Sequence, residues 1–174
     1  MARSRIRGVS FRITVLTIVA VLAIPLARAE AREWCARVQD QVLLDLLKRG
    51  MQRSFTFRSL VAALERSDIV VHLRRTEEPN ANTGFTQFIA ARGGSRFVRI
   101  TLNVAEASEF SVALLGHELQ HAVELAGEPL VVDARAYEAL YRSIGRESCT
   151  PQSPCFDTPA AVDAGRRVLK ELRG

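Results

Sequence analysis

The feature that most constrains this chain of 174 residues is the string HELQH at 117–121, which lies within an apolar stretch. Residues four apart on an α-helix lie about one turn from each other on the same face, so the imidazoles of His117 and His121 can converge on one metal ion. Glu118 is then held beside that ion. The string therefore predicts a helix that presents two metal ligands and one carboxylate to a common point.

The residues around the string predict where this helix begins and ends. Ser108 is a candidate N-cap, and Glu109 places a negative charge in the first turn. Gly127, followed by Pro129, supplies the signals that end a helix. Apolar residues recur between these ends at helical spacing, namely Leu115, Leu119, Val123 and Ala126.

The pattern predicts zinc chemistry. Two histidines at this spacing bind Zn²⁺, and the carboxylate takes a proton from a zinc-bound water whose pKa the metal has lowered to roughly 7. The hydroxide that results attacks a polarised carbonyl. A packing helix without metal is the alternative, but burying two histidines and a glutamate unpaired would be costly, and the chain has only three histidines in all.

The motif resembles the active-site helix of zincin metallopeptidases, in the three functional letters and in the apolar Leu119. The resemblance implies a zinc-dependent hydrolase of peptide or protein substrates, with His117 and His121 as ligands and Glu118 as general base. The order of the predicted elements is similar over about 68–140. It implies a small α+β domain in which a short, largely antiparallel sheet packs against the motif helix and the sheet edge holds an extended peptide by strand addition.

The third zinc ligand is left open by the sequence. A catalytic zinc has three protein ligands plus water, and no third histidine follows the motif. Asp133, which follows a Gly-Pro turn, resembles in spacing the ligand of aspartate-liganded zincins, and it equally fits a helix N-cap. Glu138 resembles the ligand of glutamate-liganded zincins, and it equally fits a solvated helix acid. We expect Asp133 slightly ahead of Glu138.

Glu124 is a third candidate on the motif helix itself. It shares a face with His117 but lies about 10 Å further along the helix axis, which is too far for both to reach one ion easily. It is better placed as a partner of His121 or as a surface acid. Tyr137 and Tyr141 lie four residues apart further on, and the resemblance implies that either hydroxyl stabilises an oxyanion, with core packing as the alternative for at least one.

Periodicity and turn signals predict one α+β domain around the motif. Gly50 fits a C-cap, Gly93-Gly94 fits the turn of an antiparallel hairpin, and Asp133 and Thr158 fit N-caps. The predicted elements are helices at 33–48 and 57–66, a strand at 69–73, hairpin strands at 85–90 and 96–102, a helix at 134–143, and a closing helix that begins at Pro159.

The first 29 residues predict a signal peptide. Arginines precede an apolar run at 13–26, and Ala27-Arg28-Ala29 offers small residues for cleavage. The run is shorter than a membrane span of about 20 residues, which favours cleavage over an uncleaved anchor. We therefore expect residues 30–174 to be exported, either to the periplasm or beyond it.

The expected signal peptide changes how the net charge and the three cysteines are interpreted. The signal segment holds five arginines and no acid, which accounts for the whole formal charge of +5, so the basic pI gives no support for nucleic-acid binding. An oxidising compartment allows disulfides. Cys149 and Cys155 flank a short loop and form the first candidate pair, with Cys35 pairing to either one as the alternative. One cysteine is left over in each case.

The sequence thus favours an exported zinc metallopeptidase with Glu118 as general base. The alternative is a non-catalytic zinc-binding or partner-binding domain on a zincin-like scaffold, because the third ligand fits neither family spacing well. A fold without any metal is the remaining hypothesis.

Overall fold

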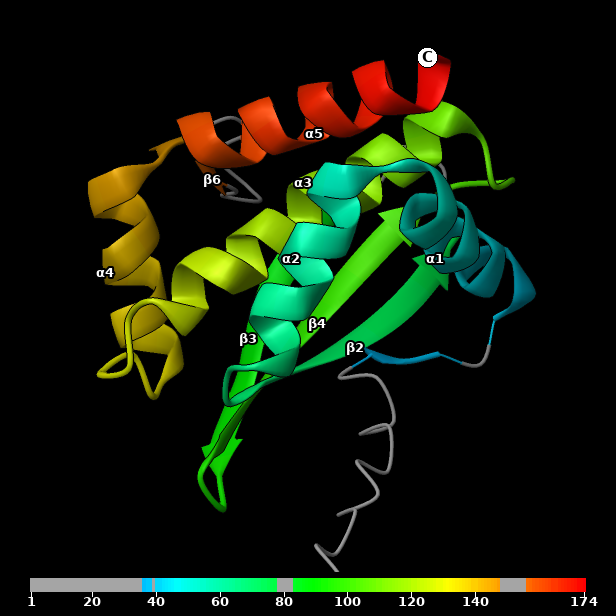
Figure 1. The fold of residues 1–174 in the computed structure, drawn as a ribbon. Coiled ribbons are helices and arrows are strands. Elements are labelled where there is room, and N and C mark those ends of the chain that lie inside the picture. The colour runs from blue at the N-terminus through cyan, green and yellow to red at the C-terminus, as the bar shows by residue number, and fades with distance from the viewer. Residues whose placement is uncertain (1–35, 39, 78–82, 148–155) are drawn as a thin grey trace, which may run out of the picture.

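The computed structural model describes residues 36–38, 40–77, 83–147 and 156–174. The expected signal peptide at 1–29 and the three cysteines, Cys35, Cys149 and Cys155, lie outside the described residues. Within them the chain forms one small α+β domain, as predicted (Figure 1). No helix among the described ranges is both long enough and apolar enough to cross a membrane.

Five helices and six strands make up the described part of the chain. The helices are α1 (Gln41–Arg53), α2 (Phe55–Glu65), α3 (Glu109–Ala126), α4 (Ala134–Ile144) and α5 (Pro159–Arg173). The strands are β1 (Ala36–Arg37), β2 (Ile69–Thr76), β3 (Gly84–Arg92), β4 (Ser95–Asn103), β5 (Arg146–Glu147) and β6 (Phe156–Asp157). The N-cap predictions at Ser108, Asp133 and Thr158 are confirmed, since each side chain accepts a hydrogen bond from a backbone N–H of its helix.

The first helix differs from its prediction at both ends. It begins only after Asp40, whose carboxylate accepts the N–H of Leu43. Gly50 is not a C-cap but lies inside α1, where a side chain would meet the ring of Phe57 at 2.7 Å. The helix runs on to Ser54, which ends α1 and also caps the start of α2.

The main sheet is mixed, whereas a largely antiparallel one was expected. Its strand order is β1-β2-β4-β3, with β2 parallel to β4 and β3 antiparallel to β4. The predicted hairpin is confirmed, and its turn residues Gly93 and Gly94 have φ of 62° and 78°, values that glycine adopts without strain. Strand β4 has the most buried side chains of the three long strands, and it lies between the other two. The chain reverses direction between β2 and β3 and again between β3 and β4, so β2 and β4 are parallel.

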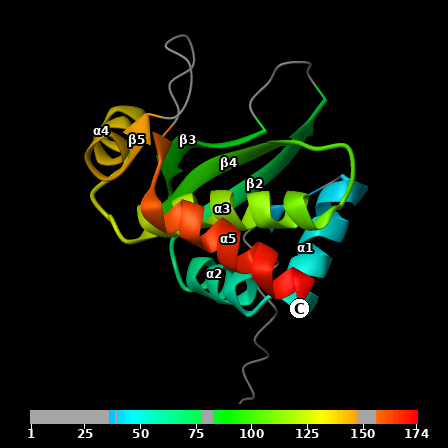
Figure 2. The same ribbon diagram turned by 90° about the horizontal axis from the view of Figure 1, so that it is seen from above.

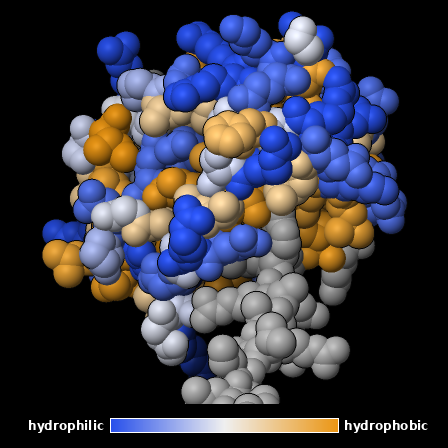
Figure 3. Space-filling model, viewed as in Figure 1, coloured by the Kyte–Doolittle hydropathy of each residue, from blue (hydrophilic) through white to orange (hydrophobic). Residues whose placement is uncertain are grey.

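The helices pack in layers on one face of the sheet. In Figure 2 the sheet forms one layer, α3 lies next to it, and α5 lies beyond α3. The core between α3 and the sheet is apolar and includes Val98, Ile100, Leu102, Leu115 and Leu119. Figure 3 shows hydrophilic side chains along α5, which is the outer layer. This arrangement buries the motif helix between the sheet and α5.

Candidate metal centre

Helix α3 holds the motif at the centre of the domain. The hydroxyl of Ser108 accepts a hydrogen bond from the N–H of Ser111 at 3.1 Å and caps the helix. The helix begins at Glu109, before the motif. Glu118 and His121 are only 3% and 4% exposed, and His117 is partly buried. The motif residues therefore face the interior beside the sheet, where solvent screens their charges little.

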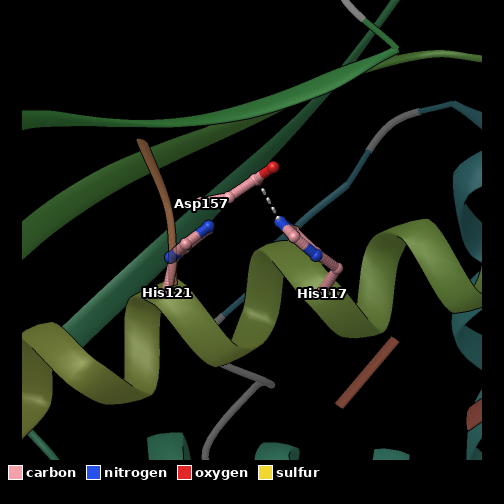
Figure 4. Close-up of side chains that lie close together, drawn as sticks. All are labelled: His117, His121 and Asp157. Atoms are coloured by element: carbon pink, nitrogen blue, oxygen red, sulfur yellow. Dashed lines mark ion pairs between the residues drawn. The ribbon is translucent and has the colours of Figure 1, made fainter. Parts of the chain in front are cut away.

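A third ligand-type side chain, Asp157, lies against the two histidines. Its Oδ1 is 3.2 Å from Nε2 of His117, and the ligand atoms of His117, His121 and Asp157 all lie within 4.8 Å of one another. Figure 4 shows the three side chains pointing toward a common space. A tetrahedral zinc at about 2.0–2.1 Å from each ligand keeps the ligand atoms roughly 3.3 Å apart, so the cluster fits this ion with small adjustments.

Close packing of α5 on α3 brings Asp157 to this place. Asp157 ends β6, directly before Thr158, the N-cap of α5. Two glycines let the helices approach: a side chain on Gly116 would meet Val168 at 2.9 Å, and one on Gly165 would meet the Cβ of His117 at 3.3 Å. The N-terminal end of α5 therefore lies beside the motif.

The ring of His121 is oriented by an acid on its own helix. Its Nδ1 lies 3.0 Å from Oε2 of Glu124, and the other carboxylate oxygen accepts the hydroxyl of Thr158. A carboxylate on one ring nitrogen fixes the tautomer and leaves the other nitrogen as a metal ligand. Glu124 thus occupies one of the two positions expected for it, next to His121.

Glu118 is held by the edge of the sheet. The hydroxyl of Thr86 on β3 donates to its Oε2 at 2.8 Å, and a side chain on Gly84 would approach its Oε1 to 3.0 Å. Burial raises the pKa of Glu118 to about 6, although the nearby His121 and the Thr86 hydroxyl act in the opposite direction. The carboxylate is therefore confined to one position beside the histidines.

Burial also sets the protonation of the neighbouring rings. It lowers the pKa of His117, an effect that His121 reinforces and Asp157 opposes, so the imidazole favours the neutral form that binds metals. It raises the pKa of Tyr137 and of Tyr141, which keeps both hydroxyls protonated as hydrogen-bond donors.

Both tyrosine hydroxyls already have partners. That of Tyr141 donates to the carbonyl of His121 at 2.5 Å, and that of Tyr137 donates to the carbonyl of Thr86 at 2.9 Å. Tyr141 is buried and so has the packing role expected for at least one of the pair. Tyr137 joins α4 to the edge of the sheet.

A cavity of about 390 Å³ opens beside these groups. Residues from β3, α3, α4 and β6 line it: Gly84, Phe85, Thr86, Gln87, Phe88, His117, Glu118, His121, Ala134, Tyr137, Glu138, Tyr141, Phe156 and Asp157. Ligand pockets in proteins have volumes of this order. The histidines, the acids and the strand edge therefore line one common cavity.

The expected third ligands lie elsewhere. Asp133 accepts the N–H of Ala136 at 2.8 Å and is the exposed N-cap of α4. Glu138 reaches the wall of the cavity but pairs with Arg142 at 2.7 Å and is half exposed. Among the described residues the structure instead places Asp157 beside His117. A ligand role for Asp133 or Glu138 stays a prediction, while the acid that the structure groups with the two histidines is Asp157.

Asp157 and Thr86 are the two site residues that the sequence did not reveal. Asp157 directly precedes the Thr-Pro signal for α5, but nothing in the sequence indicates that this helix packs on the motif helix. Thr86 lies within a predicted strand and carried no signal of its own.

A scan against protein-family models, a search of curated proteins and a search of solved structures found no match for this chain.

Proposed function

We propose that this protein is a zinc-dependent hydrolase of peptide bonds, with His117, His121 and Asp157 as zinc ligands. The observation that supports this most directly is the grouping of three ligand atoms within 4.8 Å at the wall of a cavity. Two imidazoles and one carboxylate are a donor set that zinc takes in hydrolytic sites, where the fourth position stays open to water.

Each residue of the cluster has a separate task in this proposal. A zinc ion held by these three ligands would supply a Lewis acid for the substrate carbonyl and for the attacking water. Glu118 is placed to take a proton from that water and to pass it to the leaving amine. The Thr86 hydroxyl holds the carboxylate in place, and Glu124 holds the His121 ring. Both supports are already formed in the folded chain.

The edge of β3 supports a peptide as the substrate. Among the described strands β3 has a neighbour on one side only. The N–H of Asn103 donates to the carbonyl of Thr83 at 2.9 Å, which identifies a hydrogen-bonded pair. Since such pairs alternate along an antiparallel ladder, Gly84, Thr86 and Phe88 turn their N–H and C=O groups away from β4. An extended main chain can add to these groups beside the histidines.

The test of this function is the Glu118→Gln variant, assayed with fluorescein-labelled casein as an unfolded substrate. We expect its hydrolysis rate to fall by about 10²–10⁴-fold while its zinc content equals that of the wild type. Glu128→Gln, which changes an exposed acid just beyond the same helix, is the matched control and retains the rate.

Two results would contradict the proposal in different ways. A wild-type protein that binds zinc but cleaves no casein favours the non-catalytic zinc-binding or partner-binding alternative. Equal rates in the wild type and in Glu118→Gln would mean that the glutamate has no part in the hydrolysis.

A further inference from the structure

The hydroxyl of Tyr137 already bonds to the outer edge of β3 at one point. Thr86 directs its carbonyl away from β4, and the hydroxyl of Tyr137 donates to this carbonyl at 2.9 Å. The same residue holds Glu118 through its side chain. The tyrosine therefore takes a main-chain acceptor of the residue whose side chain holds the carboxylate of the site.

The ring of Tyr137 is held in this position by neighbours on two elements. It lies 6.1 Å from the ring of Phe88 on β3 and 4.6 Å from the ring of Tyr141 on α4, measured between centroids. The hydroxyl thus reaches the strand from the side, where an added strand would lie. A main-chain N–H of an added strand and the hydroxyl of Tyr137 would therefore compete for the same position on the carbonyl of Thr86.

Of the two helices that line the cavity, α3 and α4, helix α4 is the less buried. Tyr141 is its only fully buried residue, whereas ten residues of α3 are buried. Few apolar contacts are a mark of elements that move at low cost in free energy. A shift of α4, or a rotation of the Tyr137 side chain alone, would release the carbonyl of Thr86.

We propose that Tyr137 closes the substrate edge, and that a substrate binds by replacing its hydroxyl with a main-chain N–H on the carbonyl of Thr86. This inference rests on the proposed function, because it concerns the binding step of that reaction. It makes Tyr137 a specificity-determining residue: a substrate must present an extended, unpaired main chain to displace it. Segments that are already paired in a fold or held in a helix do not meet this condition.

The hydroxyl of Tyr137 and the substrate then compete for the carbonyl of Thr86, and this competition lowers the affinity for the substrate. Removing the hydroxyl leaves the carbonyl of Thr86 open, so substrate no longer has to break a hydrogen bond before it binds. The net value of one such bond corresponds to about a two- to tenfold change in a dissociation constant. The affinity for an extended substrate should therefore rise by about this factor when the hydroxyl is removed.

The experiment measures the binding of fluorescein-labelled casein by anisotropy in the zinc-loaded Glu118→Gln protein, with and without Tyr137→Phe. Phenylalanine keeps the ring contacts and removes only the hydroxyl. Tyr137→Leu is a second variant without the hydroxyl, in case the first is poorly folded. Ser143→Ala is the control, since it removes an exposed hydroxyl of α4 that donates to the carbonyl of Leu140 and not to the strand.

We expect casein to bind about two- to tenfold more tightly in both Tyr137 variants and with no gain in Ser143→Ala. Unchanged or weaker binding in the Tyr137 variants would overturn the proposal, as would an equal gain in the control. Casein cleavage by the otherwise unmodified protein is measured in parallel. If cleavage is present and the affinities do not differ, only the role of Tyr137 fails; if cleavage and binding are both absent, the proposed function fails with it.

Discussion

At the scale of single residues, Glu124 shows how the candidate metal centre is supported. One of its carboxylate oxygens lies 3.0 Å from Nδ1 of His121, and the other accepts a hydrogen bond from the hydroxyl of Thr158. We predict that Glu124→Ala weakens zinc affinity by about 10–100-fold, because the ring of His121 loses the partner that orients it. Competition with a chromogenic chelator measures this affinity. An affinity equal to that of the Glu128→Ala control would contradict the assigned role.

Asp68 and Arg96 form a second residue pair whose effect depends on pH. Two hydrogen bonds from Arg96, each 2.7 Å, hold the carboxylate of Asp68, and they lower its pKa below the ordinary value of 3.8 even though burial acts in the opposite direction. A depressed pKa in the folded state stabilises the fold above the unfolded-state value. This contribution is lost as the pH falls through 3.8 toward the lower folded-state pKa.

We therefore predict that Asp68→Asn is less stable than the wild type at about pH 6, and that the difference shrinks at about pH 3. Urea unfolding at the two pH values measures it. The control is Asp163→Asn, which removes an exposed carboxylate on α5. A difference that is the same at both pH values would show that the Asp68 carboxylate does not contribute through its charge.

The sequence could predict only part of the site at this scale. His117, Glu118 and His121 follow from a spacing of four on one helix, which is a local property. Asp157 is brought to His117 by the packing of α5 on α3, and the sequence interval between them contains no periodic signal of that contact. Burial of Arg96, which also donates to the carbonyls of Leu125 and Glu128 at the end of α3, is likewise a result of tertiary packing.

At the scale of elements, the contact between α3 and α5 carries a prediction. A side chain on Gly116 would meet Cγ2 of Val168 at 2.9 Å, and a β-branched residue cannot rotate away. We predict that Gly116→Ala destabilises the fold by about 1–3 kcal/mol, although alanine favours a helix. Thermal and urea unfolding measure the change.

A double variant tests the cause of this effect. In a Val168→Ala background the opposing methyl groups are absent, so Gly116→Ala should be neutral or stabilising there. The control is Gly93→Ala, at a hairpin position with open space, where the cost comes from a positive φ and does not depend on Val168. Equal destabilisation by Gly116→Ala in both backgrounds would exclude the helix contact as its source.

Most elements were predictable because their signals are local. The N-caps at Ser108, Asp133 and Thr158 and the glycine turn of the hairpin are read from a few adjacent residues. The position of β4 between β2 and β3 was not, because strand order depends on contacts between strands that are distant in sequence. The extension of α1 past Gly50 likewise depends on the ring of Phe57, which belongs to the next helix.

At the scale of the whole molecule, the site joins four elements that are distant in sequence. Strand β3 supplies the edge and Thr86, α3 supplies the motif, α4 supplies Tyr137, and β6 supplies Asp157. The fold places them around one cavity because α3 lies between the sheet and α5. We propose that Asp157 completes a zinc site there with the two histidines.

The measurement that tests this claim most directly is zinc content by elemental analysis. The protein is purified without chelator or histidine tag, as the wild type and as the Asp157→Ala, Asp133→Ala and Glu138→Ala variants, each after equilibration with zinc. We predict about one zinc per chain in the wild type and in the last two variants, although Asp133→Ala loses about 1 kcal/mol of stability with its N-cap. Asp157→Ala should lose the metal while remaining folded. Full zinc in Asp157→Ala, or no zinc in the wild type, would contradict the account.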